Sequence, residues 1–239
     1  MILSHRHDPR PIVRAETAAG EARLVDLSHA IEDGMVTLRG LPAPLICDFL
    51  SREASRSHYA DGTEFQIGRI TMVANTGTYI DSPFHRFADG CDLAGLDLAR
   101  LAELDGVRVR VDGTSGRAID RSAFTACEVR DKAVLVQTGW DRHWGSERYF
   151  DGHPFLTADA AAHLRDAGAR LVGIDSLNID DTDDGHRPVH TTLLGAGIPI
   201  VEHLCHLDAL PDSGFRFFAV PPKIIGMGTF PVRAFATLD

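Results

Sequence analysis

Basic residues are scarce in this sequence. It holds 24 Lys and Arg residues against 34 Asp and Glu residues, so the formal charge is 24 − 34 = −10. A nucleic-acid binder presents a basic face to phosphates, and an anionic membrane surface also attracts basic segments. The composition therefore argues against nucleic acid and against a membrane as partners.

Cysteines and long apolar runs are scarce as well. The four cysteines form no CxxC pair, and their spacing matches neither a zinc ribbon nor a disulfide framework. No apolar run approaches the ~20 residues of a membrane span. The segment Met1–His7 lacks the uninterrupted apolar core of a signal peptide. We therefore expect a cytoplasmic protein.

Three common enzyme motifs are missing. The sequence contains neither GxGxxG nor GxxxxGK(S/T), the glycine-rich loops that hold dinucleotides and nucleoside triphosphates. The segment Gly173–Leu177 fails the GxSxG pattern of serine hydrolases, because Ser176 stands one place late and the last residue is not glycine.

The length and the apolar content indicate one globular domain. A chain of 239 residues with 44% hydrophobic residues can bury a core large enough to fold without disulfides. Continuous apolar runs at 133–137 and 171–175 predict strands buried on both faces, and residues 157–167 predict a helix. Many strands with few, short helices favour an α/β fold, a single compact domain on a mixed β-sheet.

Three further segments complete the expected organisation. Residues 1–20 are polar and irregular and predict a flexible N-terminal arm, which leaves residues 21–239 as the domain. Residues 32–64 are rich in glycine, proline and polar residues and predict long loops, which are often functional in compact domains. The alternating segment 107–112 predicts a half-exposed strand.

The densest polar segment runs from Asn75 to His85, with the sequence NTGTYIDSPFH. Asp81 and His85 stand four residues apart, and Pro83 stiffens the path between them. A carboxylate together with an imidazole suits Zn, Mn or Fe. The spacing alone leaves an alternative open, a turn in which Asp81 accepts backbone N–H groups and His85 is an ordinary loop residue.

A second polar segment, Asp180–His190, contains a run of aspartates. A calcium loop of the EF-hand type that started at Asp180 would place Thr191 where the bidentate glutamate belongs, so we reject that interpretation and predict a solvated acidic loop. His190 at its end, and Glu202 twelve residues later, are further candidate ligands beside Asp81.

Several blocks, in order, resemble the cyclase family, which includes bacterial kynurenine formamidase and isatin hydrolase. Asn75–His85 is similar to the family motif HxGTHxDxPxH, and 26–31, 137–140 and 187–190 are similar to three further family blocks. The resemblance covers the chain from about Arg23 onward. It implies a swivelling β/β/α fold, a homodimer or homotetramer, and a dinuclear zinc or single manganese site that hydrolyses a small amide or lactam.

The resemblance also implies roles for individual residues. It assigns the metal ligands to Asp81, His190 and Glu202, and a proton-shuttle role to His85. The two motif histidines that hold one metal in dinuclear members are replaced here, which leaves one divalent metal, Zn or Mn, as the expected cofactor.

The replacing residues are Asn75 and Tyr79, and Leu38 stands near the position of the family's substrate-stacking aromatic. We expect Asn75 and Leu38 to bind substrate, and Tyr79 to donate a hydrogen bond to a developing oxyanion or to protonate a leaving group. Three hypotheses stay open. They are a metal-dependent hydrolase of a small amide, lactam, ester or lactone, a metal-free acid–base lyase or cyclase, and a pseudoenzyme that binds a small molecule.

Overall fold

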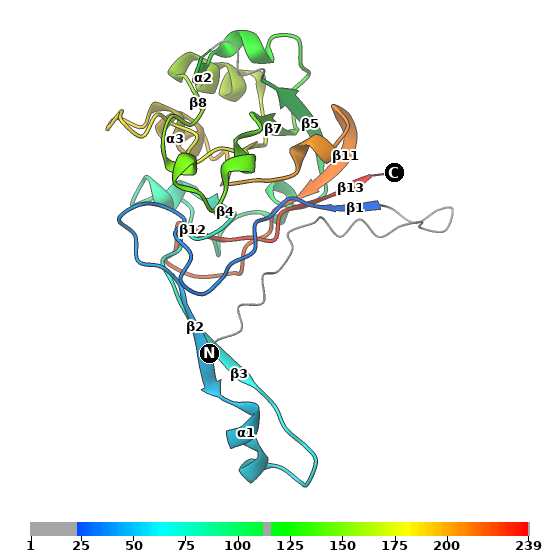
Figure 1. Ribbon diagram of the computed structural model, residues 1–239. Coiled ribbons are helices and arrows are strands. Elements are labelled where there is room, and N and C mark those ends of the chain that lie inside the picture. The colour runs from blue at the N-terminus through cyan, green and yellow to red at the C-terminus, as the bar shows by residue number, and fades with distance from the viewer. Residues whose placement is uncertain (1–22, 112–115, 239) are drawn as a thin grey trace.

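The computed structural model describes residues 23–111 and 116–238 (Figure 1). The predicted N-terminal arm, residues 1–20, lies outside this part of the chain. Within it, a nine-stranded mixed sheet forms the body. In the order in which they lie side by side, its strands are β1 (Arg23–Asp26), β13 (Phe235–Leu238), β11 (Ser213–Phe218), β5 (Leu104–Arg110), β7 (Ala133–Gln137), β9 (Leu171–Ile174), β10 (Ile200–Glu202), β4 (Tyr79–Asp81) and β12 (Thr229–Pro231).

The middle of the sheet is parallel and buried on both faces. Strands β5, β7, β9 and β10 run parallel to one another, and the strands outside them pair antiparallel. Residues 133–136 of β7 and 171–174 of β9 are fully buried, which confirms the two predicted central strands. Branched and apolar side chains suit this position because helices or further strands cover both faces of such a sheet.

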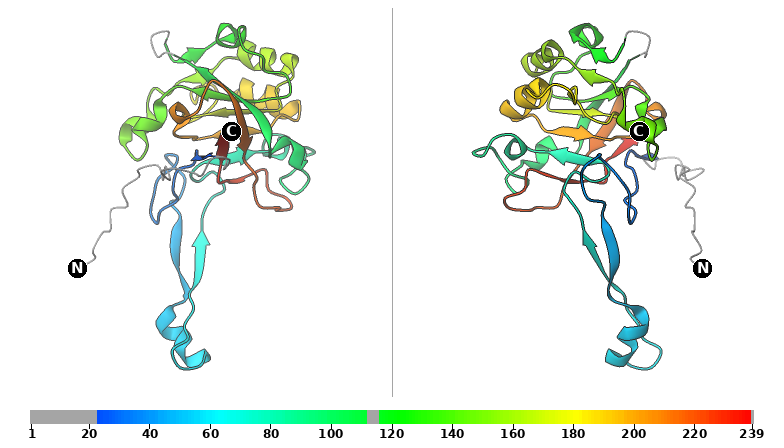
Figure 2. Two further views of the ribbon diagram at one scale, coloured as in Figure 1. Left: turned by 90° about the vertical axis from the view of Figure 1, so that its right-hand side faces the viewer. Right: turned by 60° about the vertical axis from the view of Figure 1, so that its left-hand side comes forward.

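Two hydrophobic clusters flank the sheet. On one face α2 (Ala158–Ala167) and α3 (Pro188–Gly195) pack on side chains of β7 and β9, through residues such as Leu164 and Leu193. On the other face Leu135 and Leu171 pack with Phe217 and with the outer strands. Figures 1 and 2 show the two helices on one side of the body. The predicted α/β fold on a mixed sheet, as one compact domain, is confirmed.

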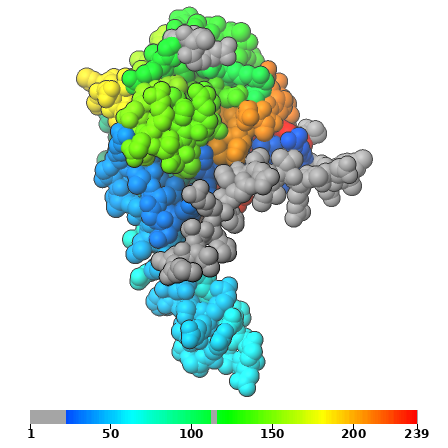
Figure 3. Space-filling model, viewed as in Figure 1, coloured from blue at the N-terminus to red at the C-terminus, as the bar shows by residue number. Residues whose placement is uncertain are grey.

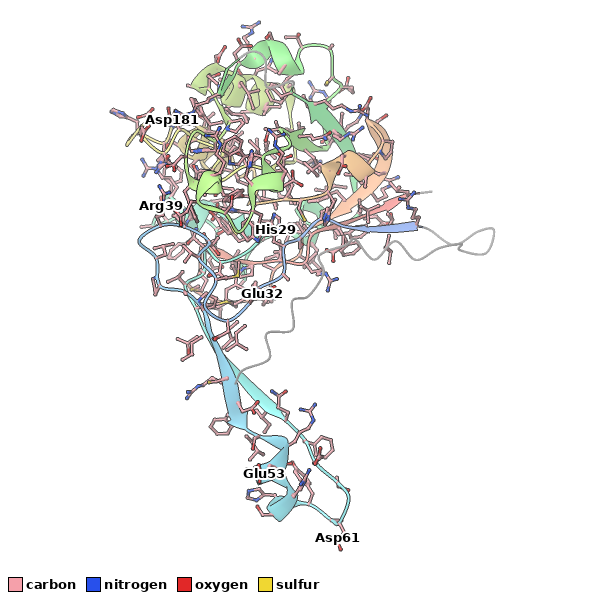
Figure 4. All side chains as sticks on the ribbon, in the orientation of Figure 1. His29, Glu32, Arg39, Glu53, Asp61 and Asp181 are labelled. Carbon is pink, nitrogen blue, oxygen red and sulfur yellow. The ribbon has the colours of Figure 1, made fainter. Side chains whose placement is uncertain are left out.

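A hairpin projects from this body, where long loops had been predicted over 32–64. Strand β2 (Leu45–Leu50) pairs antiparallel with β3 (Ile67–Thr71), and α1 (Arg52–Ser55) and a short 3-10 helix (Arg56–His58) lie between them. Figures 2 and 3 show this projecting hairpin, residues 45–71, standing away from the body, and Figure 4 marks Glu53 and Asp61 near its far end. The loop prediction was wrong for β2 because this strand is exposed on both faces and covers no core. Strand β3 lies outside the predicted loops, in a segment that the sequence predicts as a strand.

The remaining elements are short. β6 (Ala118–Ile119) pairs with β8 (Phe155–Leu156), and 3-10 helices lie at Pro83–His85, Leu98–Arg100, Arg121–Phe124, Trp140–His143, Glu147–Phe150 and Leu207–Ala209. Strand β5 is more buried than its alternation predicts, because the Arg108 side chain is enclosed and donates to the Leu207 carbonyl and to the Asp212 carboxylate. Among the described residues, no helix has the length and hydropathy that crossing a membrane requires.

Candidate active site

Strand β4 is the scaffold of the site. Tyr79 and Asp81 stand two residues apart on this strand, so both side chains lie on the same face of the sheet. The register places Glu202 of β10 opposite Tyr79, and Thr229 of β12 opposite Asp81. Directly opposite residues bring their side chains within reach of each other. Sheet pairing therefore gathers four polar side chains from three segments that are far apart in the sequence.

Two glycines let the chain make this arrangement. Gly77, just before β4, has φ +66°, a backbone conformation that L side chains rarely adopt. Gly228, just before β12, approaches the 3-10 helix Pro83–His85 so closely that an added Cβ would lie 2.4 Å from the His85 backbone nitrogen. The Gly228 carbonyl also accepts a 2.7 Å hydrogen bond from the backbone N–H of Ser82. This close approach fixes His85 beside Thr229.

Helix α3 supplies His190. Pro188 occupies its first turn, where a missing N–H costs nothing. The buried Asp180 carboxylate accepts the backbone N–H groups of Val189 and His190 at 2.7 and 3.0 Å, and contacts His190 Nδ1 at 2.6 Å. The predicted solvated loop is therefore wrong for Asp180, although Asp183 is exposed. Because Nδ1 of His190 is engaged by Asp180, its Nε2 is the nitrogen left to face the site.

The two carboxylate oxygens of Asp81 have different surroundings. The Thr229 hydroxyl donates a hydrogen bond to Oδ1. Oδ2 is buried, accepts no hydrogen bond from any described residue, and lies 3.6 Å from His190 Nε2. Buried polar atoms are almost always satisfied, so an orphaned carboxylate oxygen beside an imidazole nitrogen indicates a place for a cation.

Glu202 completes the buried polar cluster. Its Oε2 accepts hydrogen bonds from the Tyr79 hydroxyl at 2.5 Å and from the Asn178 amide at 3.3 Å. Its Oε1 accepts the Ile179 N–H at 2.6 Å and lies 3.8 Å from His190 Nε2. Burial raises the pKa of the Glu202 carboxyl, with the positive charge of His190 opposing the rise. Burial also raises the pKa of the Tyr79 phenol well above its usual value, and the charge of Glu202 adds to it.

The electrostatics of the cluster favour a positive charge. Burial alone would lower the pKa of His190, but the hydrogen bond to Asp180 and the nearby negative charges of Asp81 and Glu202 outweigh it and raise the pKa to about 10. A pocket that holds a proton this firmly on an imidazole also attracts a metal cation, which binds the neutral ring in competition with the proton.

The donor atoms lie close enough for a metal centre. One ligand atom each from Asp81, His85 and His190 lie within 4.8 Å of one another. This group shares Asp81 and His190 with the ligand set expected from the sequence and contains His85 in place of Glu202. His85 differs from the others because its side chain is partly exposed and its Nδ1 contacts the Thr229 hydroxyl at 2.8 Å. Carboxylate and imidazole donors fit zinc and manganese.

A cavity of about 280 Å³ opens beside these groups. Its lining residues are Leu38, Leu41, Asn75, Tyr79, His85, Arg86, Asn178, Arg187, His190 and Glu202. The aliphatic wall belongs to the loop after β1. Arg39, which Figure 4 labels, lies on this loop. It ties the loop to the 3-10 helix Glu147–Phe150 and the residue after it through salt bridges to Glu147 and Asp151, both at 2.8 Å.

All seven site residues expected from the sequence meet at this place. Six line the cavity, and Asp81 lies buried within hydrogen-bond reach of Thr229 behind them. The arrangement also contains residues that the sequence analysis did not single out, namely Thr229, Asp180, Asn178, Arg86 and Arg187. Arg187 opens one of the family-like blocks, 187–190, whereas Thr229 carries no local signal, because only the pairing of β12 with β4 brings it to Asp81.

The fold and the site together define a class, a mixed α/β protein with a buried carboxylate–histidine centre beside one cavity. Residues 25–181 match the family model named Cyclase. The chain belongs to the cyclase family, which confirms the resemblance drawn from the motif blocks.

Curated relatives and solved structures agree with this assignment. The chain is 31% identical over 217 residues to the kynurenine formamidase of Bacillus cytotoxicus, a match that covers 88% of this chain and 95% of that protein. It is 29% identical over 211 residues to the kynurenine formamidase of Bacillus cereus, with the same coverage of both chains.

The fold is similar to that of an isatin hydrolase bound to the product analogue thioisatinate, with a TM-score of 0.79, 21% identity, and coverage of 92% and 93% of the two chains. A structure described as a potential metal-dependent hydrolase with cyclase activity gives a TM-score of 0.73 at 26% identity, covering 92% of this chain and 99% of that one.

Proposed function

We propose that this protein is a metal-dependent hydrolase that cleaves the C–N bond of a small amide or lactam. The observation that carries the proposal is the buried Asp81 Oδ2, which has no hydrogen-bond donor and lies 3.6 Å from His190 Nε2. The family supports the same chemistry, because its members named above are a formamidase and an isatin hydrolase.

One Zn or Mn ion is the cofactor that the donor set fits. Asp81, His190 and Glu202 would hold it, and Asn75 and Tyr79 at the two altered motif positions replace a second set of imidazoles. When bound, the ion polarises a carbonyl group and lowers the pKa of water toward about 7. Tyr79 and Asn178 hold Oε2 of Glu202, which leaves Oε1 turned toward His190.

His85 is the proposed proton carrier, and its hydrogen bonds define its tautomer. The Thr229 hydroxyl has one proton, which it donates to the acceptor-only carboxylate of Asp81. The contact between Thr229 Oγ1 and His85 Nδ1 at 2.8 Å must then be a donation from Nδ1–H. Neutral His85 therefore carries its proton on Nδ1 and keeps the lone pair of Nε2 free to accept one.

The reaction follows from these positions. His85 Nε2 takes a proton as the oxygen of a water molecule bonds to the carbonyl carbon. The C–N bond then breaks, and His85 returns that proton to the leaving nitrogen, so that a carboxylic acid and an amine result. Asn75 contributes an amide to the substrate side of the cavity, and Leu38 and Leu41 supply its aliphatic wall.

We also propose that the protein assembles as a homodimer or homotetramer through the projecting hairpin. Leu45, Phe49, Ile67 and Ile70 on its strands, and Phe65 before β3, are all exposed to solvent. A two-stranded hairpin is marginally stable by itself, and exposed apolar patches mark protein interfaces. A two-fold axis would bury the hairpins of both copies at once.

The experiment that tests the proposed function measures hydrolysis with and without metal. Protein freed of metal with a chelator is reloaded with Zn or Mn and assayed with N-formylkynurenine, isatin and N-formyl-L-leucine. We expect metal-dependent turnover of at least one of them, lost in Asp81→Asn and kept in the matched surface variant Asp183→Asn. Failure of metal to bind, or turnover that survives in Asp81→Asn, would contradict the proposal.

A further inference from the structure

Two arginines line the proposed active-site cavity without a carboxylate partner. Among residues 23–111 and 116–238, neither Arg86 nor Arg187 forms a salt bridge within 4.0 Å. Several other arginines within these described residues do form salt bridges with an aspartate or a glutamate. In a chain that carries ten surplus negative charges, two cationic side chains without an acid partner at one cavity favour an anionic ligand there.

The hydrogen bonds of Arg187 leave part of its guanidinium available. Nη1 donates to the Asp181 carbonyl at 3.1 Å and to the Asn178 side-chain oxygen at 3.4 Å, and Nη2 donates to the Thr182 carbonyl at 3.5 Å. Figure 4 labels Asp181 on this loop. These neutral acceptors fix the side chain without cancelling its charge. Nε–H and one hydrogen of Nη2, the edge that binds a carboxylate in bidentate fashion, have no acceptor among the described residues.

The backbone of Arg187 is held in a costly conformation. Its φ is +50°, in the left-handed region that a residue with a long side chain rarely occupies. A glycine would adopt this conformation without strain. Strain that persists at the start of the helix carrying His190 is typical of a residue whose side chain has a function.

Arg86 adds a second cation from a different segment. It follows the 3-10 helix that carries His85, and its Nε donates to the Thr191 hydroxyl at 3.2 Å. Its two terminal nitrogens have no acceptor among the described residues. Because Thr191 lies on the first turn of α3, this bond keeps Arg86 beside the segment that begins at Arg187.

We infer that the substrate of this cavity is an aliphatic amide or lactam that carries a carboxylate, and that Arg187 and Arg86 bind this carboxylate. The inference rests on the proposed function and narrows its substrate class. The aliphatic part of the substrate meets Leu38 and Leu41, the carboxylate meets the guanidinium groups, and the scissile carbonyl lies toward Asp81 and His190. Arg187 and Arg86 are binding residues and take no part in proton transfer.

The test measures binding to metal-free protein, so that a carboxylate cannot bind through a metal ion. The probes are N-formyl-L-leucine and N-formyl-L-leucinamide, which differ only in a carboxylate against a neutral amide. We expect the carboxylate to bind about tenfold tighter or more in calorimetry or ligand-observed NMR, since charge-assisted bidentate hydrogen bonds are the strong ones. Arg187→Gln and Arg86→Gln should each reduce this preference, and the double variant should abolish it.

Three controls keep the result interpretable. Arg187→Gly removes the guanidinium and also relieves the strain of the positive φ, so it should stay folded and reduce the preference as Arg187→Gln does. Arg187→Lys keeps the positive charge but not the planar guanidinium that binds a carboxylate through two hydrogen bonds, and it should keep part of the preference. Arg100→Gln removes an arginine whose one hydrogen-bond acceptor among the described residues is the Gly197 carbonyl, outside the cavity, and should leave the preference unchanged.

Equal binding of the two probes, no binding of the carboxylate, or a preference that survives the double variant would overturn the inference. Because these measurements need neither metal nor turnover, they separate the inference from the proposed function. A carboxylate preference in a protein that hydrolyses none of the assayed amides would contradict the hydrolase and keep the anion site. Metal-dependent turnover with equal binding of both probes would support the hydrolase and contradict the anion site.

Discussion

Replacing Thr229 with valine tests how the proton carrier is positioned. The side chain is buried and nearly isosteric with valine, so the change removes one hydroxyl and little volume. Two contacts are lost, the hydrogen bond to Asp81 Oδ1 and the 2.8 Å contact with His85 Nδ1. A hydrogen bond to a charged group contributes about 1.5–3 kcal/mol. We expect the free energy of unfolding to fall by about 1.5–3 kcal/mol for this reason.

The effect on catalysis follows from the tautomer of His85. Without the Thr229 oxygen as acceptor, nothing favours a proton on Nδ1 over one on Nε2, and the second tautomer has no lone pair at the nitrogen that faces the reaction. We expect kcat/KM to fall by about 10–100-fold, which corresponds to about 1.4–2.8 kcal/mol in the barrier. Thr229→Ser keeps the hydroxyl and should retain most of the activity.

Two assays check this expectation. Steady-state kinetics on a substrate found in the panel above gives kcat/KM, and ¹⁵N-detected NMR of labelled histidine gives the tautomer of His85 without any substrate. An unchanged Nδ1–H tautomer and unchanged kcat/KM in Thr229→Val would show that Thr229 does not position His85. A lower kcat/KM with an unchanged tautomer would show that the hydroxyl acts through Asp81 alone.

Three further predictions concern other parts of the molecule. Tyr79→Phe removes the donor to Glu202 Oε2 and should weaken Zn or Mn binding by about 10–100-fold in a chelator competition; unchanged affinity would contradict the positioning of Glu202. Burial lowers the pKa of His29 to about 3, so the folded state holds this ring neutral. The contribution of neutral His29 to the free energy of unfolding is complete above pH 6.5 and is lost as the pH falls from 6.5 toward about 3. When the pH is lowered from 7 to 4.5, the free energy of unfolding measured with urea should fall by roughly 2 kcal/mol more in the wild type than in His29→Phe, a variant that keeps the stacking on Trp144. Parallel pH profiles of the two proteins would contradict this prediction. Phe49→Glu on the projecting hairpin should yield monomers in sedimentation experiments, whereas Leu98→Glu, at a residue that is also largely exposed but lies on the body, should not.

Local sequence patterns predicted the centre of the fold well. Strands β7 and β9 are apolar runs bounded by polar residues, and their burial on both faces leaves little choice of structure. Helix α2 carries its own cap position and apolar stripe. Strand β3 falls within residues 66–74, whose imperfect alternation indicates a strand. Strand β2 was missed because glycine, proline and polar residues surround it, and because nothing in the described chain covers the apolar side chains of the hairpin.

The site was predictable where one segment holds several functional residues. Tyr79, Asp81 and His85 lie in one motif, so a single match finds all three. Thr229 lies 148 residues from Asp81 and reaches it only through the β4–β12 register, which no local pattern encodes. Asp180 looked like one more residue of a charged loop, and only the geometry of α3 shows that it is buried against His190.

The metal content of the protein shows most directly whether Asp81, His190 and Glu202 hold one divalent metal ion. Protein that has been equilibrated with Zn or Mn and then dialysed is measured by elemental mass spectrometry. We expect about one equivalent per chain, in line with one set of three protein ligands. This equivalent should be lost in Asp81→Asn and kept in Asp183→Asn. No bound metal, or the same metal content in Asp81→Asn as in the wild type, would rule out a metal ion held by these three residues.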